Sequence, residues 1–490
     1  MTIQRTDKVL QVSKLNPNVV NVEYAVRGEL AIRAEQLKEQ LASTPGSLPF
    51  KTITNCNIGN PQQLEQKPIT FFRQVASLVD YPDLLKPENA QITSQLFKPD
   101  AVDRARTLLA AMGGSSGAYS HSKGIPLIRK HVADFIEERD GYPANPEHIF
   151  LTAGASPGVQ LVLQTLIQNS NVGIMIPIPQ YPLYTASIAL FNGKAVPYYL
   201  DESAETFGLD IVELKRSIQE ARNSGVDVRA LCVINPGNPT GQVLTEESMK
   251  DIIRFCHEEK LVLLADEVYQ TNIYLSTLPF HSFKKVLKSL GPAYEGLELI
   301  SFNSVSKGMV GECGRRGGYF ECTGVSDDII DMFYKVASVS LCPPVQGQVM
   351  VDLTVRPPKK GDPSYPEYRA EIDAIYESLK RRATKLAAAF NSLEGVICPP
   401  AQGAMYLFPR IVLPQGAIDA AQKAGKQPDA LYCMEMLNAT GVCMVPGSGF
   451  CQREGTWHFR STFLPPENQL DSFIDSVAHF HNSFVKKYSN

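Results

Sequence analysis

Short apolar runs alternate with segments of helical periodicity through the middle of the chain. The apolar runs end in Gly, Pro or polar residues, and they lie at 148–154, 171–179, 229–236, 261–267 and 297–307. Such runs are typical of strands that are buried on both faces of a parallel sheet. Helix-like segments lie between them, at 157–168, 246–259 and 327–336. The alternation predicts an α/β domain whose parallel strands are joined by right-handed crossovers.

The two ends of the chain have different patterns. Residues 1–65 contain one helical stretch near 28–41 and a Pro/Gly-rich turn at 57–63, so we interpret them as an arm. After the α/β pattern, a Pro/Lys/Gly-rich loop at 356–368 leads into a long helical pattern that ends near residue 391. The remainder predicts a smaller α+β domain. We therefore expect three parts, namely an arm (1–65), a large domain with a mostly parallel sheet flanked by helices (66–365) and a small C-terminal domain (366–490).

Composition excludes several classes of protein. The net charge of -4 and the pI near 6.1 give no basic surface for nucleic acid. No apolar run reaches the roughly 18 residues of a membrane span, and the N-terminus has no apolar core of a secretory signal. Ten cysteines without a C-x-x-C spacing predict reduced thiols, and no His cluster predicts a metal site. We expect a cytoplasmic protein, while basic residues near the N-terminus leave a mitochondrial form open.

Two strand ends carry residues that need an explanation. The run at 297–307 ends in Ser-Val-Ser-Lys307, and a lysine at the end of a buried strand is costly unless it is paired, neutral or chemically bonded. An imine with an aldehyde cofactor would consume the amine, whereas the alternative is an exposed loop lysine. The run at 261–267 ends in Asp266, which could keep a pyridine nitrogen protonated or could simply cap a helix.

Two further strand ends fit the same cofactor. The segment NPGNPTG (235–241) forms a rigid turn after a strand, where Asn238 could hold a cofactor hydroxyl. In LTAGASPGVQ (151–160), Gly154 to Ser156 begin a helix, and free backbone N–H groups there can bind phosphate. Neither motif is decisive alone, since turns and small residues at helix starts are common. The chain contains no G-x-G-x-x-G and no G-x-x-x-x-G-K-[ST] motif of nucleotide-binding proteins.

Taken in order, these strand ends resemble those of the fold-type I aminotransferases, in their class I/II branch. The resemblance extends from about residue 24 to the C-terminus and implies pyridoxal 5'-phosphate as the cofactor. Lys307 would then carry the cofactor as a Schiff base, and Asp266 would hold the pyridine nitrogen. Asn238 and Tyr269 would bind the phenolic oxygen. The resemblance also implies a phosphate site and a stacking aromatic ring, formed by Ala155, Ser156, Ser304 and Arg315 and by Tyr181.

The same resemblance implies a homodimer with shared active sites. Tyr119, in GAYSHSKGIPLIR, would reach the phosphate of the neighbouring subunit. Arg460, in HFRSTFLPP, would form a two-pronged ion pair with the substrate α-carboxylate, although a surface salt bridge is the structural alternative.

Within that branch, several phrases are similar to the alanine aminotransferases, namely VEYAVRG, NIGNPQ, SLCPPVQGQ, PPKKGDPSY, GAMYLFP and GTWHFR. This similarity implies that Tyr24 and Arg27 lie in a segment that closes over the substrate. It also implies a backbone contact from Gly59 near the substrate carboxylate and a role for Arg27 beside the glutamate side chain, unless Arg27 is only structural.

The implied reaction is the reversible transfer of the amino group from L-alanine to 2-oxoglutarate, which gives pyruvate and L-glutamate. An aromatic or kynurenine aminotransferase, or a carbon–sulfur or aminocyclopropane-forming lyase of the same fold, remains an alternative. A non-catalytic regulator built on this fold would need an added DNA-binding module, and the arm at 1–65 is short and not basic.

Overall fold

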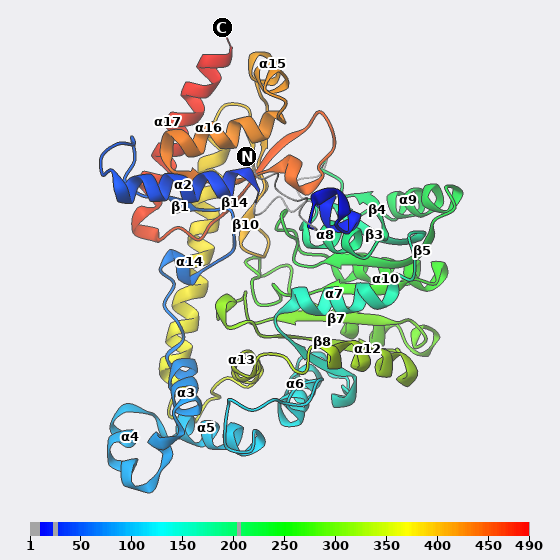
Figure 1. The fold of residues 1–490 in the computed structure, drawn as a ribbon, viewed down its shortest axis with the longest axis vertical. Helices are drawn as coiled ribbons and strands as arrows, with labels where there is room; N and C mark the ends of the chain where they lie inside the picture. The colour runs from blue at the N-terminus through cyan, green and yellow to red at the C-terminus, as the bar shows by residue number, and fades with distance from the viewer. Residues whose placement is uncertain (1–9, 23–27, 203–206, 490) are drawn as a thin grey trace, which may run out of the picture.

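The structure is a computed structural model that describes residues 10–22, 28–202 and 207–489. Within these ranges a seven-stranded sheet runs in the order β2-β8-β7-β6-β5-β3-β4 (Figure 1). Its strands are β2 (Ile149–Thr152), β3 (Val172–Ile178), β4 (Lys194–Tyr199), β5 (Asp227–Ile234), β6 (Val262–Asp266), β7 (Leu299–Ser304) and β8 (Gly318–Thr323). The five apolar runs found in the sequence all form strands, which confirms the predicted α/β fold.

One strand departs from the predicted parallel arrangement. β8 pairs antiparallel with both β2 and β7, whereas the other pairs are parallel. An antiparallel return needs no crossover helix, so β8 follows β7 after a loop that carries Lys307. The edge strand β4 escaped the sequence analysis because its buried and exposed positions alternate, unlike those of a continuous apolar run.

Helices cover both faces of the large sheet. One face packs against α7 (Ala155–Leu166), α8 (Leu183–Leu190) and α12 (Asp327–Val339). The other face packs against α9 (Ile211–Asn223), α10 (Glu246–Glu259) and α11 (Phe283–Ser289). A further apolar cluster joins α3 (Thr70–Asp80), α5 (Pro99–Ala111), α6 (Pro126–Asp140) and α13 (Val345–Val355), with α4 (Ala90–Leu96) beyond them. The continuous apolar strands are therefore enclosed, as their pattern requires.

A second, smaller layer is built mostly from the C-terminal part of the chain. It contains a sheet in the order β10-β14-β11-β9, with β13 also paired to β14. Its strands are β9 (Val396–Ile397), β10 (Tyr406–Leu407), β11 (Arg410–Ile411), β12 (Val442–Cys443), β13 (Val445–Pro446) and β14 (Trp457–Thr462). The helices α15 (Gln415–Lys423), α16 (Pro428–Thr440) and α17 (Leu470–Tyr488) pack beside this sheet (Figure 1).

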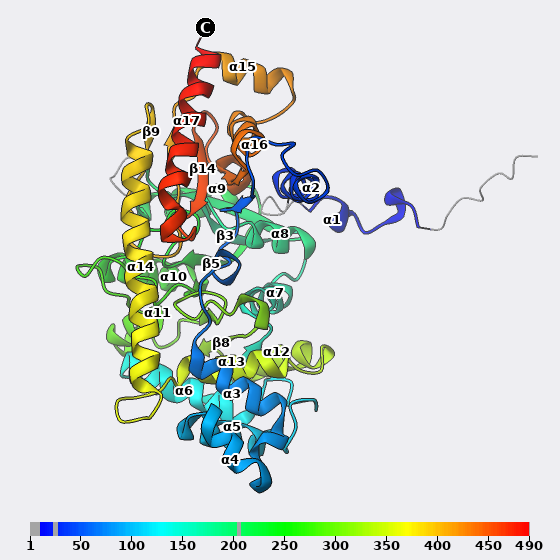
Figure 2. The same cartoon turned by 90° about the vertical axis from the view of Figure 1, so that its left-hand side faces the viewer.

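The N-terminal segment joins this second layer. The short strand β1 (Thr54–Asn55) pairs in parallel with β12, and α2 (Glu29–Ser43) packs against α16, while α1 (Pro17–Val20) lies nearer α8. The 27-residue helix α14 (Tyr365–Asn391) runs along the molecule from the α3–α6 end to the C-terminal layer (Figure 2). The division into an arm, a large domain and a small domain stays a prediction.

Candidate active site

A cavity of about 460 Å³ lies at the carboxyl ends of the central strands. Polar residues that follow β5, β6 and β7 meet there, as expected for the ligand site of an open α/β sheet. Three of them are Asn238, Asp266 and Lys307, and Arg460 of β14 enters from the second layer. Residues separated by more than two hundred positions in the sequence therefore share one cavity.

Lys307 places its amine inside this cavity. The residue lies in the loop after β7, and its Nζ donates a hydrogen bond of 2.8 Å to the backbone oxygen of Gly59. The approach at Gly59 is close, since a Cβ added there would lie 2.9 Å from Nζ. The absence of a side chain at Gly59 therefore leaves room for the amine.

Asp266 ends β6 and is 5% exposed. One carboxylate oxygen, Oδ2, accepts a hydrogen bond of 2.8 Å from the hydroxyl of Tyr184, whereas Oδ1 is buried and has no partner in the described part of the chain. Burial raises the pKa of Asp266 to about 6, although the Tyr184 hydroxyl, the backbone N–H of Val268 and the charge of Lys307 act in the opposite direction. A buried acceptor without a donor indicates that a group from outside the chain completes the site.

The N-terminus of α7 forms another wall. Gly154 precedes the helix with φ of 95°, and Ala155 and Ser156 line the cavity with the first free N–H groups of the helix. Ser304, at the end of β7, lines the same wall and donates a hydrogen bond of 3.0 Å to Ser306. This corner suits a phosphate group.

The arginine at this corner is Arg316, and the prediction of Arg315 needs correction. Arg316 lines the cavity, whereas Arg315 does not. A Cβ added at Gly154 would lie 2.6 Å from Nη2 of Arg316, so this guanidinium lies directly beside the helix N-terminus. The backbone of Arg316 has a left-handed conformation, with φ of 56°. Spacing along the sequence alone could not separate two adjacent arginines.

The predicted aromatic and amide residues line the same cavity as Lys307, and their roles towards a cofactor stay predictions. Tyr181, Asn238 and Tyr269 all line the cavity. The hydroxyl of Tyr269 donates a hydrogen bond of 3.0 Å to the hydroxyl of Tyr406, a residue that the sequence analysis did not single out. Burial by itself would raise the pKa of Tyr406, but the positive charges of Lys307 and its neighbour Arg460 outweigh burial, and the pKa is lowered.

Arg460 is fully enclosed, with an exposed fraction of 1%. Its Nη1 donates a hydrogen bond of 2.8 Å to Oδ1 of Asn238, and its Nη2 donates to the backbone oxygen of Asn57. The guanidinium lies 4.4 Å from the ring centre of Tyr406. No carboxylate of the described residues forms an ion pair with it, which excludes the surface salt bridge considered above. A buried arginine without a counter-ion is suited to an anionic ligand.

The remaining candidates lie outside the cavity or outside the described residues. Tyr119 is 79% exposed and does not line the cavity of its own chain. Its predicted role in a neighbouring subunit stays a prediction. Tyr24 and Arg27 lie outside the described residues.

The structure also identifies residues that sequence reasoning missed. Tyr184 supports Asp266, Ser306 lies beside Ser304, and Tyr406 joins Tyr269 to the cavity. Two of them had a signal in the sequence, since Ser306 lies in Ser-Val-Ser-Lys307 and Tyr406 lies in the phrase GAMYLFP, whereas the packing that brings Tyr406 to the cavity is tertiary.

The chain matches the family model described as aminotransferase class I and II over residues 88–477. It is 54% identical to alanine aminotransferase 2 of Panicum miliaceum over 97% of this chain and 98% of that protein. It is 50% identical to glutamate–glyoxylate aminotransferase 2 of Arabidopsis thaliana over 99% of this chain and 98% of that protein. It is also 48% identical to a protein of Saccharomyces cerevisiae named inactive alanine aminotransferase, over 97% and 94% of the two chains.

Among solved structures, the chain is similar to alanine aminotransferase from Pyrococcus furiosus, with a TM-score of 0.74, 22% identity and coverage of 96% of this chain and 100% of that one. The fold and the match to the family model together define the class. The chain belongs to the class I and II aminotransferases, enzymes that use pyridoxal 5'-phosphate.

The cavity fits this cofactor. The unpartnered Oδ1 of Asp266 can accept a hydrogen bond from the protonated pyridine nitrogen, the start of α7 can bind the phosphate, and Lys307 supplies the amine.

No helix of the described residues is both long and apolar enough to cross a membrane. The described residues also contain no cluster of three His, Cys, Asp or Glu that could hold a metal ion.

Proposed function

We propose that this chain is an alanine aminotransferase, which transfers the amino group of L-alanine to 2-oxoglutarate and gives pyruvate and L-glutamate. The observation that carries the proposal is the convergence of three groups on one cavity. They are the amine of Lys307, the carboxylate of Asp266 with one unpartnered oxygen, and the guanidinium of Arg460, which has no counter-ion among the described residues. Relatives of similar length that are named alanine aminotransferases support the choice of amino acid.

The residues divide the chemistry between them. Pyridoxal 5'-phosphate, when bound, supplies an electron sink for the electron pair that is left on the substrate Cα after proton removal. Lys307 is placed to remove that proton and to return it on the opposite side of the transferred nitrogen. Asp266, as a carboxylate, keeps the ring nitrogen protonated.

Binding and orientation fall to the remaining residues. Arg460 holds the α-carboxylate of either substrate, and Asn238 fixes the guanidinium by accepting one of its hydrogens. Ala155, Ser156, Ser304 and Arg316 surround the phosphate end, with Arg316 in place of Arg315. Tyr269 would bind the phenolic oxygen, and Tyr181 would stack on the ring.

The test is a spectrum and a substrate panel. The purified protein with pyridoxal 5'-phosphate should have a visible absorption band that bleaches with L-alanine and returns with 2-oxoglutarate. Turnover with L-alanine and 2-oxoglutarate should exceed turnover with L-phenylalanine or L-kynurenine by at least 100-fold. A protein that binds the cofactor but gives no turnover with any pair would resemble the relative named inactive, and the proposal would then be wrong.

Glyoxylate is the second acceptor to compare. The relative named glutamate–glyoxylate aminotransferase 2 is 50% identical to this chain, close to the identity of the relatives named for alanine. A higher kcat/KM for glyoxylate with L-glutamate than for 2-oxoglutarate with L-alanine would favour this second function.

We also propose a homodimer with shared active sites. Tyr119 and Val339 are 79% and 84% exposed, and Ser122 donates a hydrogen bond of 2.6 Å to the backbone oxygen of Leu341, so both exposed segments lie together. Exposed apolar side chains that lie together are typical of an interface. Mixing inactive Lys307→Ala subunits with Tyr119→Ala subunits should restore activity if Tyr119 acts on the partner.

A cytoplasmic location stays a prediction, since some relatives are named mitochondrial.

A further inference from the structure

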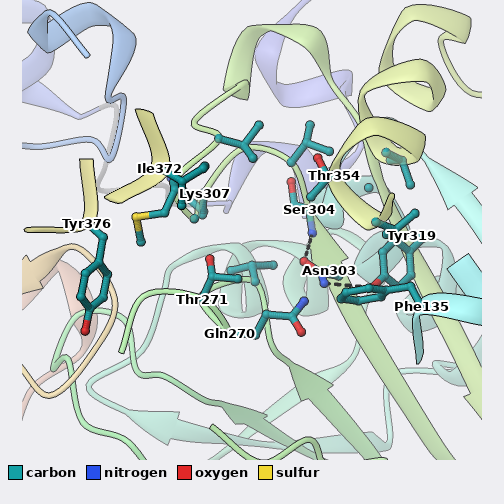
Figure 3. Close-up of a pocket in the computed structure, with 18 of the residues that line it drawn as sticks. Phe135, Gln270, Thr271, Asn303, Ser304, Lys307, Tyr319, Thr354, Ile372 and Tyr376 are labelled. Carbon is teal, nitrogen blue, oxygen red and sulfur yellow. Dashed lines mark hydrogen bonds between the residues drawn. The ribbon is translucent and has the colours of Figure 1, made fainter. Parts of the chain in front are cut away.

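A second cavity, of about 400 Å³, borders the segment that carries Lys307 (Figure 3). It shares Val268, Ser304 and Lys307 with the catalytic cavity, so the loop after β7 has a cavity on each side. The reaction proposed above uses only the first of these cavities. The amine of Lys307 points to Gly59 in the catalytic cavity, and the second cavity faces other parts of the same loop, including Gly308 and Met309.

Most of the wall of this second cavity is apolar. Phe135 of α6, Val351 and Val355 of α13, and Ile372 of α14 contribute side chains from three helices. Figure 3 shows Ile372 and Tyr376 on the side of α14, across the cavity from Phe135 and Tyr319. A cavity of this size with a mostly apolar wall suits a small organic molecule rather than water alone.

Three hydrogen-bond donors on the wall have hydrogens that no acceptor of the described residues uses. The side-chain oxygen of Gln270 accepts from Arg139 at 2.7 Å, which leaves the amide N–H groups of Gln270 unused. The oxygen of Tyr319 accepts from Asn303 at 3.0 Å, which leaves its own hydrogen unused. Thr271 is an exposed residue that also lines the cavity, and its hydroxyl has no hydrogen-bond partner within the described ranges. The wall therefore offers donors to a ligand that carries an acceptor.

The charges around the cavity favour a neutral acceptor. The cations that line or adjoin it already have acceptors among the described residues: Lys307 has the backbone oxygen of Gly59, Arg369 has Asp373, Arg139 has Asp140 and Lys284 has Glu321. The small void beyond Asn303 and Tyr319 is lined by Arg139, Glu267 and Glu321, and burial raises the pKa of Glu267 to about 8. A carboxylate in the second cavity would therefore be buried without a free counter-ion, which is costly. A carbonyl oxygen accepts the same hydrogen bonds without that cost.

We propose that this second cavity binds a small neutral molecule that has an apolar body and one carbonyl oxygen held by Thr271, Gln270 and Tyr319. Because the loop with Lys307 lies between the two cavities, an occupant changes the turnover of the enzyme without competing with the amino acid. The catalytic arginine has no part in this recognition, since the ligand carries no carboxylate.

Binding is measured first, by calorimetry on the pyridoxal-phosphate-loaded protein with 4-phenyl-2-butanone as the probe. Ile372→Trp fills the cavity from α14, and we expect at least a tenfold weaker Kd. The matched control is Ile375→Trp, three residues further along the same helix, which lines a different pocket and should change Kd by no more than twofold. The double variant Thr271→Val, Tyr319→Phe removes two donors and should weaken binding at least fivefold.

Kinetics then test the coupling. Saturating probe should change kcat by at least twofold and leave the KM for L-alanine unchanged. Displacement of the probe by L-alanine, equal binding to the two tryptophan variants, or no binding up to the solubility limit of the probe would each overturn the proposal. If Ile372→Trp does not fold, as judged by circular dichroism, the binding affinity of the double variant Thr271→Val, Tyr319→Phe tests the proposal instead. Because binding is measured without turnover, these outcomes do not depend on which amino acid the enzyme uses.

Discussion

Asp266 provides a test in which the stability and the activity of this protein move in opposite directions. The carboxylate is 5% exposed, one of its oxygens has no partner in the described chain, and burial raises its pKa from 3.8 to about 6. Its ionised form is therefore costly in the absence of the cofactor. We predict that Asp266→Asn stabilises the cofactor-free protein and removes most of the activity of the loaded enzyme.

The magnitude follows from the difference in pKa between the folded and unfolded states. The pKa of Asp266 is higher in the folded state than in the unfolded state. The free energy of unfolding is therefore highest below pH 3.8, where the carboxyl is protonated in both states, and it falls as the pH rises through 6. At pH 8 the loss for the wild-type carboxylate is about 3 kcal/mol, and at pH 5 it is about half of that. The neutral asparagine has no such loss, so its advantage should grow from pH 5 to pH 8.

The assay is urea unfolding of both cofactor-free proteins at several pH values, because a bound cofactor would add its own stabilisation. Asp373→Asn, at an exposed ion pair with Arg369, is the control and should give no stabilisation. In the loaded enzyme, loss of the partner of the ring nitrogen should lower kcat by about 10²- to 10³-fold. An asparagine variant that is less stable than wild type at pH 8, or whose advantage does not change with pH, would refute the reasoning.

Four other changes test the remaining groups of the site. Lys307→Ala should remove the visible absorption band and lower turnover by at least about 10⁴-fold, and near-normal turnover would contradict its role. Arg460→Lys should raise KM for both substrates by about 10- to 100-fold in steady-state assays, since the two-pronged ion pair is lost. Arg316→Gln should weaken cofactor affinity at least tenfold in a fluorescence titration, whereas Arg315→Gln should change it less than twofold. A larger loss of affinity in Arg315→Gln would show that Arg315 binds the phosphate. Gly59→Ala should lower kcat at least tenfold, because the added carbon would lie 2.9 Å from Nζ of Lys307. An unchanged kcat would show that the loop moves to make room for the added carbon.

The positions of the strand-end residues could be predicted because apolar runs in a parallel sheet end at a common edge. Asp266 and Lys307 each follow such a run, and Asn238 follows another within a few residues. Arg460 could be named from its phrase, but the pattern could not exclude a surface salt bridge. Its burial and its contact with Asn238 are tertiary facts.

What the sequence determined by itself was local: which segments form strands and helices, and which polar residues stand at their ends. Hydrophobic periodicity indicates which whole face of a helix or strand is buried. It therefore predicted α10 with the bounds that the structure has, and it missed the edge strand β4, in which buried and exposed residues alternate. The tertiary structure alone decided which of two adjacent arginines lies in the cavity beside the start of α7, because that depends on how the loop after β7 packs against Gly154. It also brought Tyr406 to Tyr269 across 137 positions, a contact that depends on how two layers pack and that no local pattern encodes.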